Sequence, residues 1–177
     1  MRDIAQKFNK DFNCDGFFPL PEPLISKNIS RVMSLRDGTK KMSKSEESEY
    51  SRINLNDDAD QIIKKIKKAK SDSATIPDDL KKLEKKPEAL NLINIYSEVS
   101  EKKINDVLNI MAGKEYSFLK DKLAELLVEE ISPIGKEIKK LMKDETYLLE
   151  ILKKGTEKAR IKAEENLKNI REKVGLI

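Results

Sequence analysis

Residues 39–45 place lysine and hydroxyl side chains on one short segment, named the lysine loop, directly after the turn signal Asp37-Gly38. Lysine ammonium groups offset the charge of phosphate, and hydroxyls together with free backbone N–H groups complete its hydrogen bonds. The pattern therefore predicts a polyphosphate-binding loop. The alternative is a solvated surface loop, because lysine and serine are common in this chain. The segment reads Thr39, Lys40, Lys41, Met42, Ser43, Lys44 and Ser45.

Five consecutive residues of the lysine loop, from Lys41 to Ser45, spell KMSKS, the second signature of class I aminoacyl-tRNA synthetases. The flanking sequence resembles bacterial-type tryptophanyl-tRNA synthetases in order and spacing. Since the resemblance covers nearly the whole chain, chance convergence on one loop is a poor explanation. The segments that carry it are RVMSL (31–35), IIKKIKKA (62–69), SDS (71–73), LNLINIY (90–96), GTEKA (155–159) and VGL (174–176).

An earlier signature of class I enzymes, HIGH or a variant, is not found in this sequence. The 177 residues contain no histidine and no glycine-rich strand-to-helix turn. The opening residues 1–9 resemble a helix late in the nucleotide-binding sheet domain. The resemblance therefore implies the C-terminal portion of such an enzyme, and we expect this chain alone to be catalytically incomplete.

The resemblance assigns roles to the lysine loop in the activation of tryptophan by ATP. Lys41 and Lys44 match the two motif lysines, which implies catalytic contact with the β- and γ-phosphates and with the departing pyrophosphate. Ser43 and Ser45 match the motif serines and would hold the loop or donate to phosphate. The implied ligand is ATP with Mg²⁺ carried by the nucleotide, so no protein metal site is predicted.

Val32 and Met42 match positions that flank the adenine base in this family, Met42 chiefly through its backbone. Each also has a purely structural interpretation. Val32 is an ordinary core residue of a strand in that case, and Met42 is a side chain that fills a gap. Lys40 lies outside the pentapeptide and is expected to be a solvated charge.

The composition favours helices. Apolar and charged residues each make up 38% of the sequence, which suits helices with one thin apolar stripe. Aromatic residues are only 5% and tryptophan is absent, which argues against an all-β fold. The net charge of +4, from 36 basic and 32 acidic residues, requires any nucleic-acid surface to be a local patch. Cys14 is the single cysteine, so an internal disulfide is excluded.

The sequence of the N-terminal part predicts one helix, over residues 3–12, and little other regular structure. Pro19, Pro21 and Pro23 disfavour helix and favour an extended connection. The short apolar run over residues 29–35 is the one convincing strand. Because one strand cannot make a sheet, this pattern independently predicts a partner domain.

A basic helix is predicted after the lysine loop. Asn56 is the expected cap, with Asp57 and Asp58 in the first turn, where negative charge meets the positive end of the helix dipole. The lysines of this helix predict contact with tRNA phosphates, and a solvated helix face is an equally weighted alternative. The apolar face comprises Ala59, Ile62, Ile63, Ile66 and Ala69, and the rest carries Lys64, Lys65, Lys67, Lys68 and Lys70.

Capping residues and apolar spacing predict further helices along the rest of the chain. Pro87 suits a first helical turn, Ser100 a cap, and Gly113 a stop. Pro133 is expected to bend a long helix, and Asp144 to cap the next. The expected helices cover residues 87–99, 100–113, 117–131, 144–152 and 159–174.

The predicted fold is mainly α, a helical bundle attached to the tail end of a class I Rossmann-like α/β catalytic domain. Residues 1–53 are the expected remnant of the catalytic domain, including the KMSKS loop. Residues 54–177 are the expected α-helical tRNA-binding domain, whose last helix could pack back on the catalytic domain. The family's helical domain receives the anticodon arm, and the aromatic candidates for base stacking are Tyr116, Phe118 and Tyr147.

The resemblance implies a tryptophan–tRNA ligase that activates tryptophan with ATP and transfers it to its tRNA. The family is homodimeric, and this portion could be monomeric. A truncated, non-catalytic tRNA-binding module is the second hypothesis, and a general helical interaction protein, which would not need KMSKS, is the third. No apolar run approaches the roughly 20 residues of a membrane span, and no signal peptide is recognisable. The cytoplasm is therefore the expected location.

Overall fold

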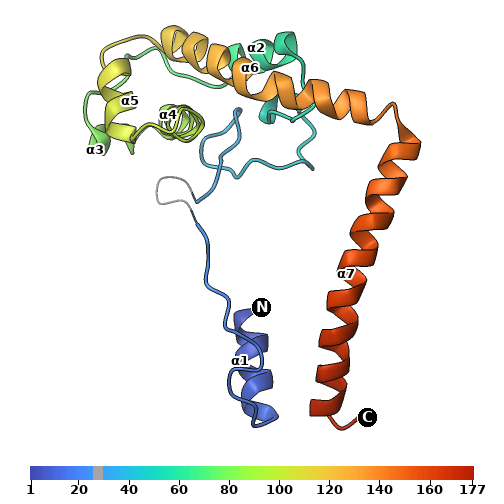
Figure 1. The fold of residues 1–177 in the computed structure, drawn as a ribbon. Helices are drawn as coiled ribbons and strands as arrows, with labels where there is room; N and C mark the ends of the chain where they lie inside the picture. The colour runs from blue at the N-terminus through green and yellow to red at the C-terminus, as the bar shows by residue number, and fades with distance from the viewer. Residues whose placement is uncertain (26–29) are drawn as a thin grey trace. The chain divides into compact units, whose positions relative to one another are not determined.

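Helices make up all the regular secondary structure of the described residues, 1–25 and 30–177 of a computed structural model (Figure 1). The mainly α fold predicted from composition is confirmed. The helices are α1 (Arg2–Asp11), the 3₁₀ turn η1 (Glu49–Ser51), α2 (Ala59–Lys67), α3 (Leu80–Leu83), α4 (Pro87–Val99), α5 (Ile104–Met111), α6 (Tyr116–Leu141) and α7 (Glu145–Lys173).

The chain divides into two compact units. One unit, Ile25–Lys140, contains the lysine loop and the helices from α2 to α6. The other combines Met1–Leu24 with Leu141–Ile177 and contains α1 and α7. This division concerns packing, so the domain boundary predicted between residues 53 and 54 stays a prediction.

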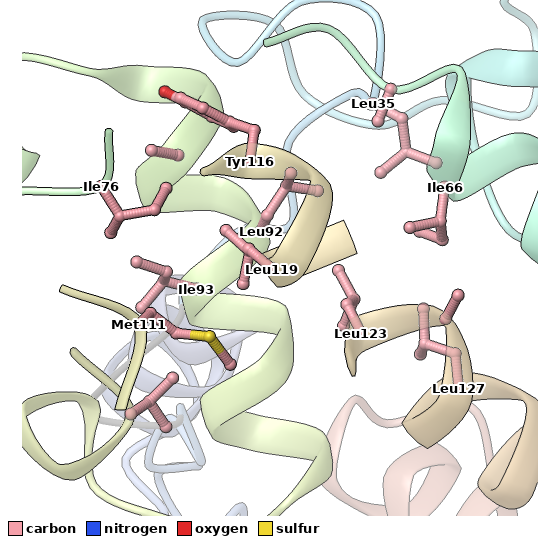
Figure 2. Packing of buried hydrophobic residues seen from close by; sticks show 14 of the residues in the cluster. Leu35, Ile66, Ile76, Leu92, Ile93, Met111, Tyr116, Leu119, Leu123 and Leu127 are labelled. Atoms are coloured by element: carbon pink, nitrogen blue, oxygen red, sulfur yellow. The ribbon is translucent and has the colours of Figure 1, made fainter. Parts of the chain in front are cut away.

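The core of the unit Ile25–Lys140 is a cluster of buried aliphatic side chains from several helices (Figure 2). On α6, Leu119, Leu123 and Leu127 recur every four residues, so they share one face, and all three are buried. Met111 of α5 and Leu35, which precedes the lysine loop, are buried in the same cluster. Burying each such side chain contributes roughly 1.5–3 kcal/mol. The core therefore supports the loop as well as the helices.

The strand predicted over residues 29–35 is wrong for its described part, residues 30–35, and Ile29 lies outside the described residues. Met33 makes an isolated antiparallel bridge to Lys41. The buried Asn91 side chain, on α4, occupies the backbone groups of Met33: its Oδ1 accepts from the Met33 N–H at 3.0 Å, and its Nδ2 donates to the Met33 carbonyl at 2.9 Å. A helix side chain thus takes the place of a neighbouring strand.

Helix α2 begins later than predicted. Its cap is Asp58 rather than Asn56: the Asp58 carboxylate accepts from the Gln61 N–H, and Gln61 Oε1 accepts from the Asp58 N–H, both at 2.9 Å. Asp57 is not in the first turn but is buried, with Oδ2 2.6 Å from Lys65 Nζ. Since Lys65 points inward to this carboxylate, its predicted place on the exposed lysine face is wrong.

Two glycines let helices approach the segments on either side of the lysine loop. A Cβ on Gly38 would lie 2.5 Å from the backbone carbonyl carbon of Pro87, in the first turn of α4. A Cβ on Gly135, in α6, would lie 2.9 Å from the carbonyl oxygen of Leu55. Backbone atoms cannot move aside as a flexible side chain can, so both positions require glycine. These contacts anchor the chain before and after the lysine loop.

The helix boundaries downstream are mostly as predicted. Helix α4 begins at Pro87, and Gly113, just beyond α5, has the left-handed φ of 73° that favours glycine. The cap predicted at Ser100 is wrong, because Ser100 ends α4 and Lys103 precedes α5. Helix α6 continues through Pro133, and the bend expected there stays a prediction.

In the other unit, α1 confirms the helix predicted over residues 3–12. The ring of Phe8 lies 4.6 Å from that of Phe12 and 4.9 Å from that of Phe18, centroid to centroid. Asn9 donates from Nδ2 to the Phe18 carbonyl at 2.9 Å and accepts from the Phe18 N–H at 3.0 Å. These contacts fold the chain after α1 back onto the helix.

Helix α7 is one continuous helix where the sequence predicted two. The predicted cap is confirmed, because Asp144 Oδ1 accepts from the Tyr147 N–H at 2.9 Å. Gly155 does not interrupt the helix, since glycine in a helix interior costs only about 1 kcal/mol relative to alanine. No residue of α7 is buried, and Leu152 and Ile161 are 64% and 69% exposed. Packing of this helix on a catalytic domain stays a prediction.

Candidate functional site

The lysine loop lines an open groove of about 980 Å³ in the unit Ile25–Lys140. This volume is at the upper end of the roughly 300–1,000 Å³ usual for small-molecule sites. The groove brings together all the predicted site residues except Ser45, namely Val32, Lys41, Met42, Ser43 and Lys44. It also includes Arg31, Glu49 and Arg52, which the sequence interpretation did not single out.

Backbone hydrogen bonds pair the two segments that form this wall of the groove. The Ser34 N–H donates to the Lys40 carbonyl at 2.8 Å, and the Met42 N–H donates to the Val32 carbonyl at 3.0 Å. The Leu35 N–H donates to the Ser51 carbonyl at 2.9 Å. The lysine loop therefore begins on a fixed, hairpin-like base.

The turn before the lysine loop is held by Asp37. Its Oδ1 accepts from the Thr39 hydroxyl at 2.6 Å and from the Thr39 N–H at 3.0 Å. These two hydrogen bonds lower the pKa of Asp37, the side-chain bond more than the backbone bond. Lys40 Nζ lies 3.7 Å from Asp37 Oδ2, so Lys40 is paired within the turn instead of being merely solvated.

Lys41 and Lys44 are exposed, and neither forms an ion pair with any part of the chain that the structure describes. Ser43 and Ser45 bind each other instead of the lysines: their hydroxyl oxygens are 2.8 Å apart, and the Ser45 N–H donates to Ser43 Oγ at 3.3 Å. This small serine turn shapes the loop. The two ammonium groups remain available to an anion in the groove.

Val32 and Met42 differ in their surroundings. Val32 is 39% exposed, so its interpretation as a strand core residue is wrong. The Met42 side chain packs against the hydrophobic core, which agrees with a gap-filling role. Both nevertheless line the groove.

A chain of ionic contacts runs from the end of the lysine loop to α2. Arg52 contacts Glu49, whose Oε2 lies 3.8 Å from Lys65 Nζ, and Lys65 pairs with Asp57 at 2.6 Å. Asp57 Oδ2 also accepts from the Asn54 N–H at 2.8 Å. No simple sequence signal could have found the whole chain of contacts, because only Glu49 and Arg52 have helical spacing, whereas Asp57 and Lys65 are eight residues apart.

The lysines of the basic helix fall into two groups, those that are paired or buried and those that are exposed. Lys70 follows α2 and pairs with Glu88 at 2.8 Å, and Lys65 is buried. Lys64, Lys67 and Lys68 are exposed and form no ion pair with the described residues.

Lys68 also lies next to an aromatic side chain from the segment that follows the lysine loop. Its Nζ is 4.3 Å from the centroid of the Tyr50 ring. A hydrogen bond from Lys68, and then the charge of Lys64, lower the pKa of Tyr50. The exposed part of the basic helix is thus a small cationic surface with one aromatic ring beside it.

The aromatic candidates for base stacking have different exposures. Tyr116 is only 5% exposed, and burial raises its pKa to about 12. Phe118 is half-buried with the Lys114 ammonium 3.9 Å from its ring centroid. Tyr147, on α7, is 48% exposed. Because the Tyr116 ring is buried, it cannot stack on a base.

The described residues contain neither a metal-ligand cluster nor a membrane-spanning helix. Among residues 1–25 and 30–177, no group of three or more histidine, cysteine, aspartate or glutamate side chains is arranged to hold a metal ion. Within the same residues, no helix combines the length and apolar character needed to cross a membrane. The cytoplasmic location stays a prediction.

Comparison with known proteins identifies the family of the chain that forms this groove. Residues 1–133 match the family described as tRNA synthetases class I (W and Y). The chain belongs to this family. Among the curated relatives, the tryptophan–tRNA ligase of Caulobacter vibrioides is 49% identical over 174 residues, covering 98% of this chain and 51% of the relative. The tryptophan–tRNA ligase of Mesorhizobium japonicum is 44% identical over 194 residues, covering 99% and 55%.

Solved structures of the same class I synthetases resemble the chain as well. A tryptophanyl-tRNA synthetase from Mycoplasma pneumoniae matches with a TM-score of 0.81 and 26% identity over 98% of this chain and 51% of that chain. One from Campylobacter jejuni, solved with ADP and tryptophan, matches with a TM-score of 0.63 and 27% identity over 98% and 52%. The resemblance to tryptophanyl enzymes is confirmed, and the chain spans about half the length of the curated relatives it matches.

Proposed function

We propose that this chain supplies the ATP-phosphate loop and the tRNA-facing helices of a tryptophan–tRNA ligase. The observation that carries the proposal is two exposed ammonium groups, on Lys41 and Lys44, that form no ion pair with the described residues and share one groove with Val32 and Met42. The names of the curated relatives and the ADP and tryptophan bound to the Campylobacter jejuni enzyme support the choice of substrates.

The first reaction would be attack by a carboxylate oxygen of tryptophan on the α-phosphorus of ATP. A new P–O bond forms, the bond to the bridging oxygen breaks, and its electron pair leaves with pyrophosphate. Negative charge grows on the leaving oxygens, where Lys41 and Lys44 would stabilise it. Lysine suits this task because its flexible stem lets the ammonium follow a moving charge. Mg²⁺ arriving with ATP would neutralise the remaining phosphate charge.

The adenine base would lie between Val32 and Met42. The Met42 N–H already donates to the Val32 carbonyl. The Met42 carbonyl is then the backbone group left to read the base, and as an acceptor it matches the exocyclic amino group of adenine. The serine turn of Ser43 and Ser45 would keep this backbone in place while the lysines move.

tRNA would be the second substrate. Lys64, Lys67 and Lys68 are the members of the basic helix with charge to spare for phosphates, because Lys65 and Lys70 are already paired. Phosphate contacts of this kind position a nucleic acid without reading its sequence. Recognition of the anticodon would therefore need residues other than these three lysines.

The experiment that tests the proposal compares the chain alone with a chimera. In the chimera, the N-terminal half of the Caulobacter vibrioides relative is joined to the 177-residue chain. Tryptophan-dependent pyrophosphate exchange is expected from the chimera and absent from the chain alone, since the chain has no histidine for a HIGH-type motif. A Lys41→Ala, Lys44→Ala chimera is the matched control and is expected to be inactive. Exchange by the chain alone, or full activity of the control, would contradict the proposal.

A second candidate function is tRNA binding without amino-acid activation, and it rests on the exposed Lys64, Lys67 and Lys68. It predicts that the isolated chain binds tRNA and that the chimera shows no exchange although it folds and binds ATP. The two candidates therefore give opposite results in the same assay.

A further inference from the structure

Arg52 lies in the groove but outside the signature that defines the lysine loop. Its side chain is only 11% exposed. One guanidinium nitrogen, Nη1, donates to the Glu46 carbonyl at 2.8 Å, and the other, Nη2, contacts the Glu49 carboxylate. Glu46 directly follows Ser45. One side chain therefore holds the C-terminal end of the lysine loop.

The partner of Arg52 is itself fixed. Glu49 Oε2 accepts from Asn54 Nδ2 at 3.3 Å and lies 3.8 Å from Lys65 Nζ. Lys65 is bound to Asp57, and their side chains are only 7% and 6% exposed. Arg52 is thus one end of an ionic chain that passes through Glu49, which is 61% exposed, to the buried pair of Lys65 and Asp57. This chain connects the carbonyl that Arg52 holds to α2.

The two ends of the lysine loop are consequently anchored by different means. The N-terminal end is held by backbone pairing, from Lys40 to Ser34 and from Met42 to Val32. The C-terminal end has no such pairing within the described residues, and the Glu46 carbonyl is bound by a side chain instead. A change at Arg52 would therefore release one end of the loop and leave the other in place.

We infer that Arg52 is a positioning residue that acts through the Glu46 backbone and sets where the Lys44 ammonium lies in the groove. Its relevance to ATP rests on the function proposed above. The planar guanidinium presents donors in fixed directions and can bind a carbonyl and a carboxylate together. A lysine ammonium carries the same charge but is a point on a flexible stem, so Arg52→Lys separates fixed geometry from charge alone.

The test measures native-state trypsin cleavage of the 177-residue chain at the bond after Lys44, followed by mass spectrometry. Removing a hydrogen bond made by a charged group should open the loop end and speed cleavage about tenfold in Arg52→Gln. Arg52→Lys should fall between Arg52→Gln and the wild type. Arg36→Gln is the matched control, because Arg36 donates to the Lys68 carbonyl at 2.9 Å, at the end of α2. It should leave cleavage after Lys44 unchanged.

Two results would overturn the inference. Wild-type protection in Arg52→Lys would mean that charge alone matters. Equal acceleration at every tryptic site in Arg52→Gln, with a matching fall in the thermal midpoint, would mean that Arg52 only stabilises the fold. Hydrogen exchange of the backbone amides of residues 42–47 gives a second measurement that does not depend on a protease, and it should show the same order of the variants.

A final arm adds MgATP to the chimera with the Caulobacter vibrioides N-terminal half, carrying the same Arg52 variants. It should slow cleavage after Lys44 in the wild type, and the ATP concentration that gives half protection should rise in Arg52→Gln. If MgATP protects no variant, including the wild type, the proposed ATP function fails. The order of cleavage rates without ATP still decides the positioning role of Arg52, so the two failures are distinguishable.

Discussion

Lys44 in the lysine loop and Lys65 in α2 are the same residue type in two neighbouring regions, and their surroundings are opposite. Lys44 is exposed and unpaired within the described residues, whereas Lys65 is buried and bound to Asp57 at 2.6 Å. A charge left without a partner is available to a ligand. A charge that is buried with its partner stabilises the structure and is not available to a ligand.

The contrast teaches that the lysines of this chain must be sorted by what they contact before any is assigned a function. Buried charges need a partner because desolvation of an ion is costly. Exposed charges gain little from a partner, since surface pairs contribute only about 0–1 kcal/mol. The two regions therefore predict opposite outcomes for the same substitution: loss of stability at Lys65, and loss of chemistry at Lys44.

The largest effect is expected from Lys65→Met, which leaves the Asp57 carboxylate buried without its cation. Breaking a buried pair in this way costs about 3–5 kcal/mol. Urea unfolding of the 177-residue chain measures the change. Lys64→Met, at the exposed neighbouring position, is the control and should change the free energy of unfolding by less than about 0.5 kcal/mol. Equal stabilities for the two variants would remove the basis of the comparison.

Lys44→Ala should slow the chemical step and leave the stability of the fold unchanged. In the chimera with a Caulobacter N-terminal half, the activation free energy of the chemical step should rise by about 2.7–4 kcal/mol. The reason is that the ammonium stabilises charge that develops in the transition state. The free energy of unfolding should stay as in the wild type. Single-turnover kinetics separate the chemical step from ATP binding. A change in the KM for ATP alone would mean that Lys44 binds the ground state only.

The exposed lysines of α2 extend the comparison to tRNA. For each phosphate contact that is lost when Lys64, Lys67 and Lys68 are changed to Gln, the slope of log K for tRNA binding against log salt should become about one unit less steep. Filter binding at several salt concentrations measures the slope. Lys70→Gln is the control, since Lys70 already pairs with Glu88. An unchanged slope in the triple variant would show that this face is only solvated.

The smallest effect concerns the pair of Glu88 and Lys70. A hydrogen bond from Lys70 lowers the pKa of Glu88 below its usual 4.5. Because folding lowers this pKa, the stabilisation is fully present above pH 4.5 and is lost as the pH falls through the folded-state value. Wild type and Glu88→Gln should therefore differ by less than about 1 kcal/mol at pH 7. The difference should shrink as the pH falls below 4.5 and through the lowered pKa of Glu88. A difference that grows on acidification would contradict the prediction.

The lysine loop was predictable because its chemistry is local. Charge, hydroxyls and a preceding turn all lie within residues 37–45, and the structure brings five of the six predicted site residues to one groove. Their catalytic and binding roles stay predictions. The mainly α fold was also predictable, since the apolar spacing on α6 and the proline at the start of α4 are local signals.

The burial of Lys65 was not predictable from the spacing on α2. A lysine next to the apolar stripe normally points to solvent, and only the buried Asp57, outside the helix, reverses this. The strand over residues 29–35 failed for a similar reason, because the partner of Met33 is a side chain far along the sequence, Asn91. Partners distant in sequence leave no periodic signal.

The merging of two expected helices into α7 has a different cause. A glycine in the middle of a helix is tolerated when nothing else stops the helix, and α7 runs through Gly155 from Glu145 to Lys173. The apolar side chains on this helix predict a partner surface, yet none of its residues is buried. Helical spacing predicted this face, and its packing against a partner surface stays a prediction.

The double hydrogen bond between Asn91 and Met33 has a consequence for solubility. Extended backbone with unpaired N–H and C=O groups is a template on which another chain can add a strand, and such edges promote aggregation. Asn91 occupies both groups of Met33 with one buried amide. A helix thereby blocks the apolar segment before the lysine loop from recruiting a neighbouring molecule, although the segment has the composition of a strand.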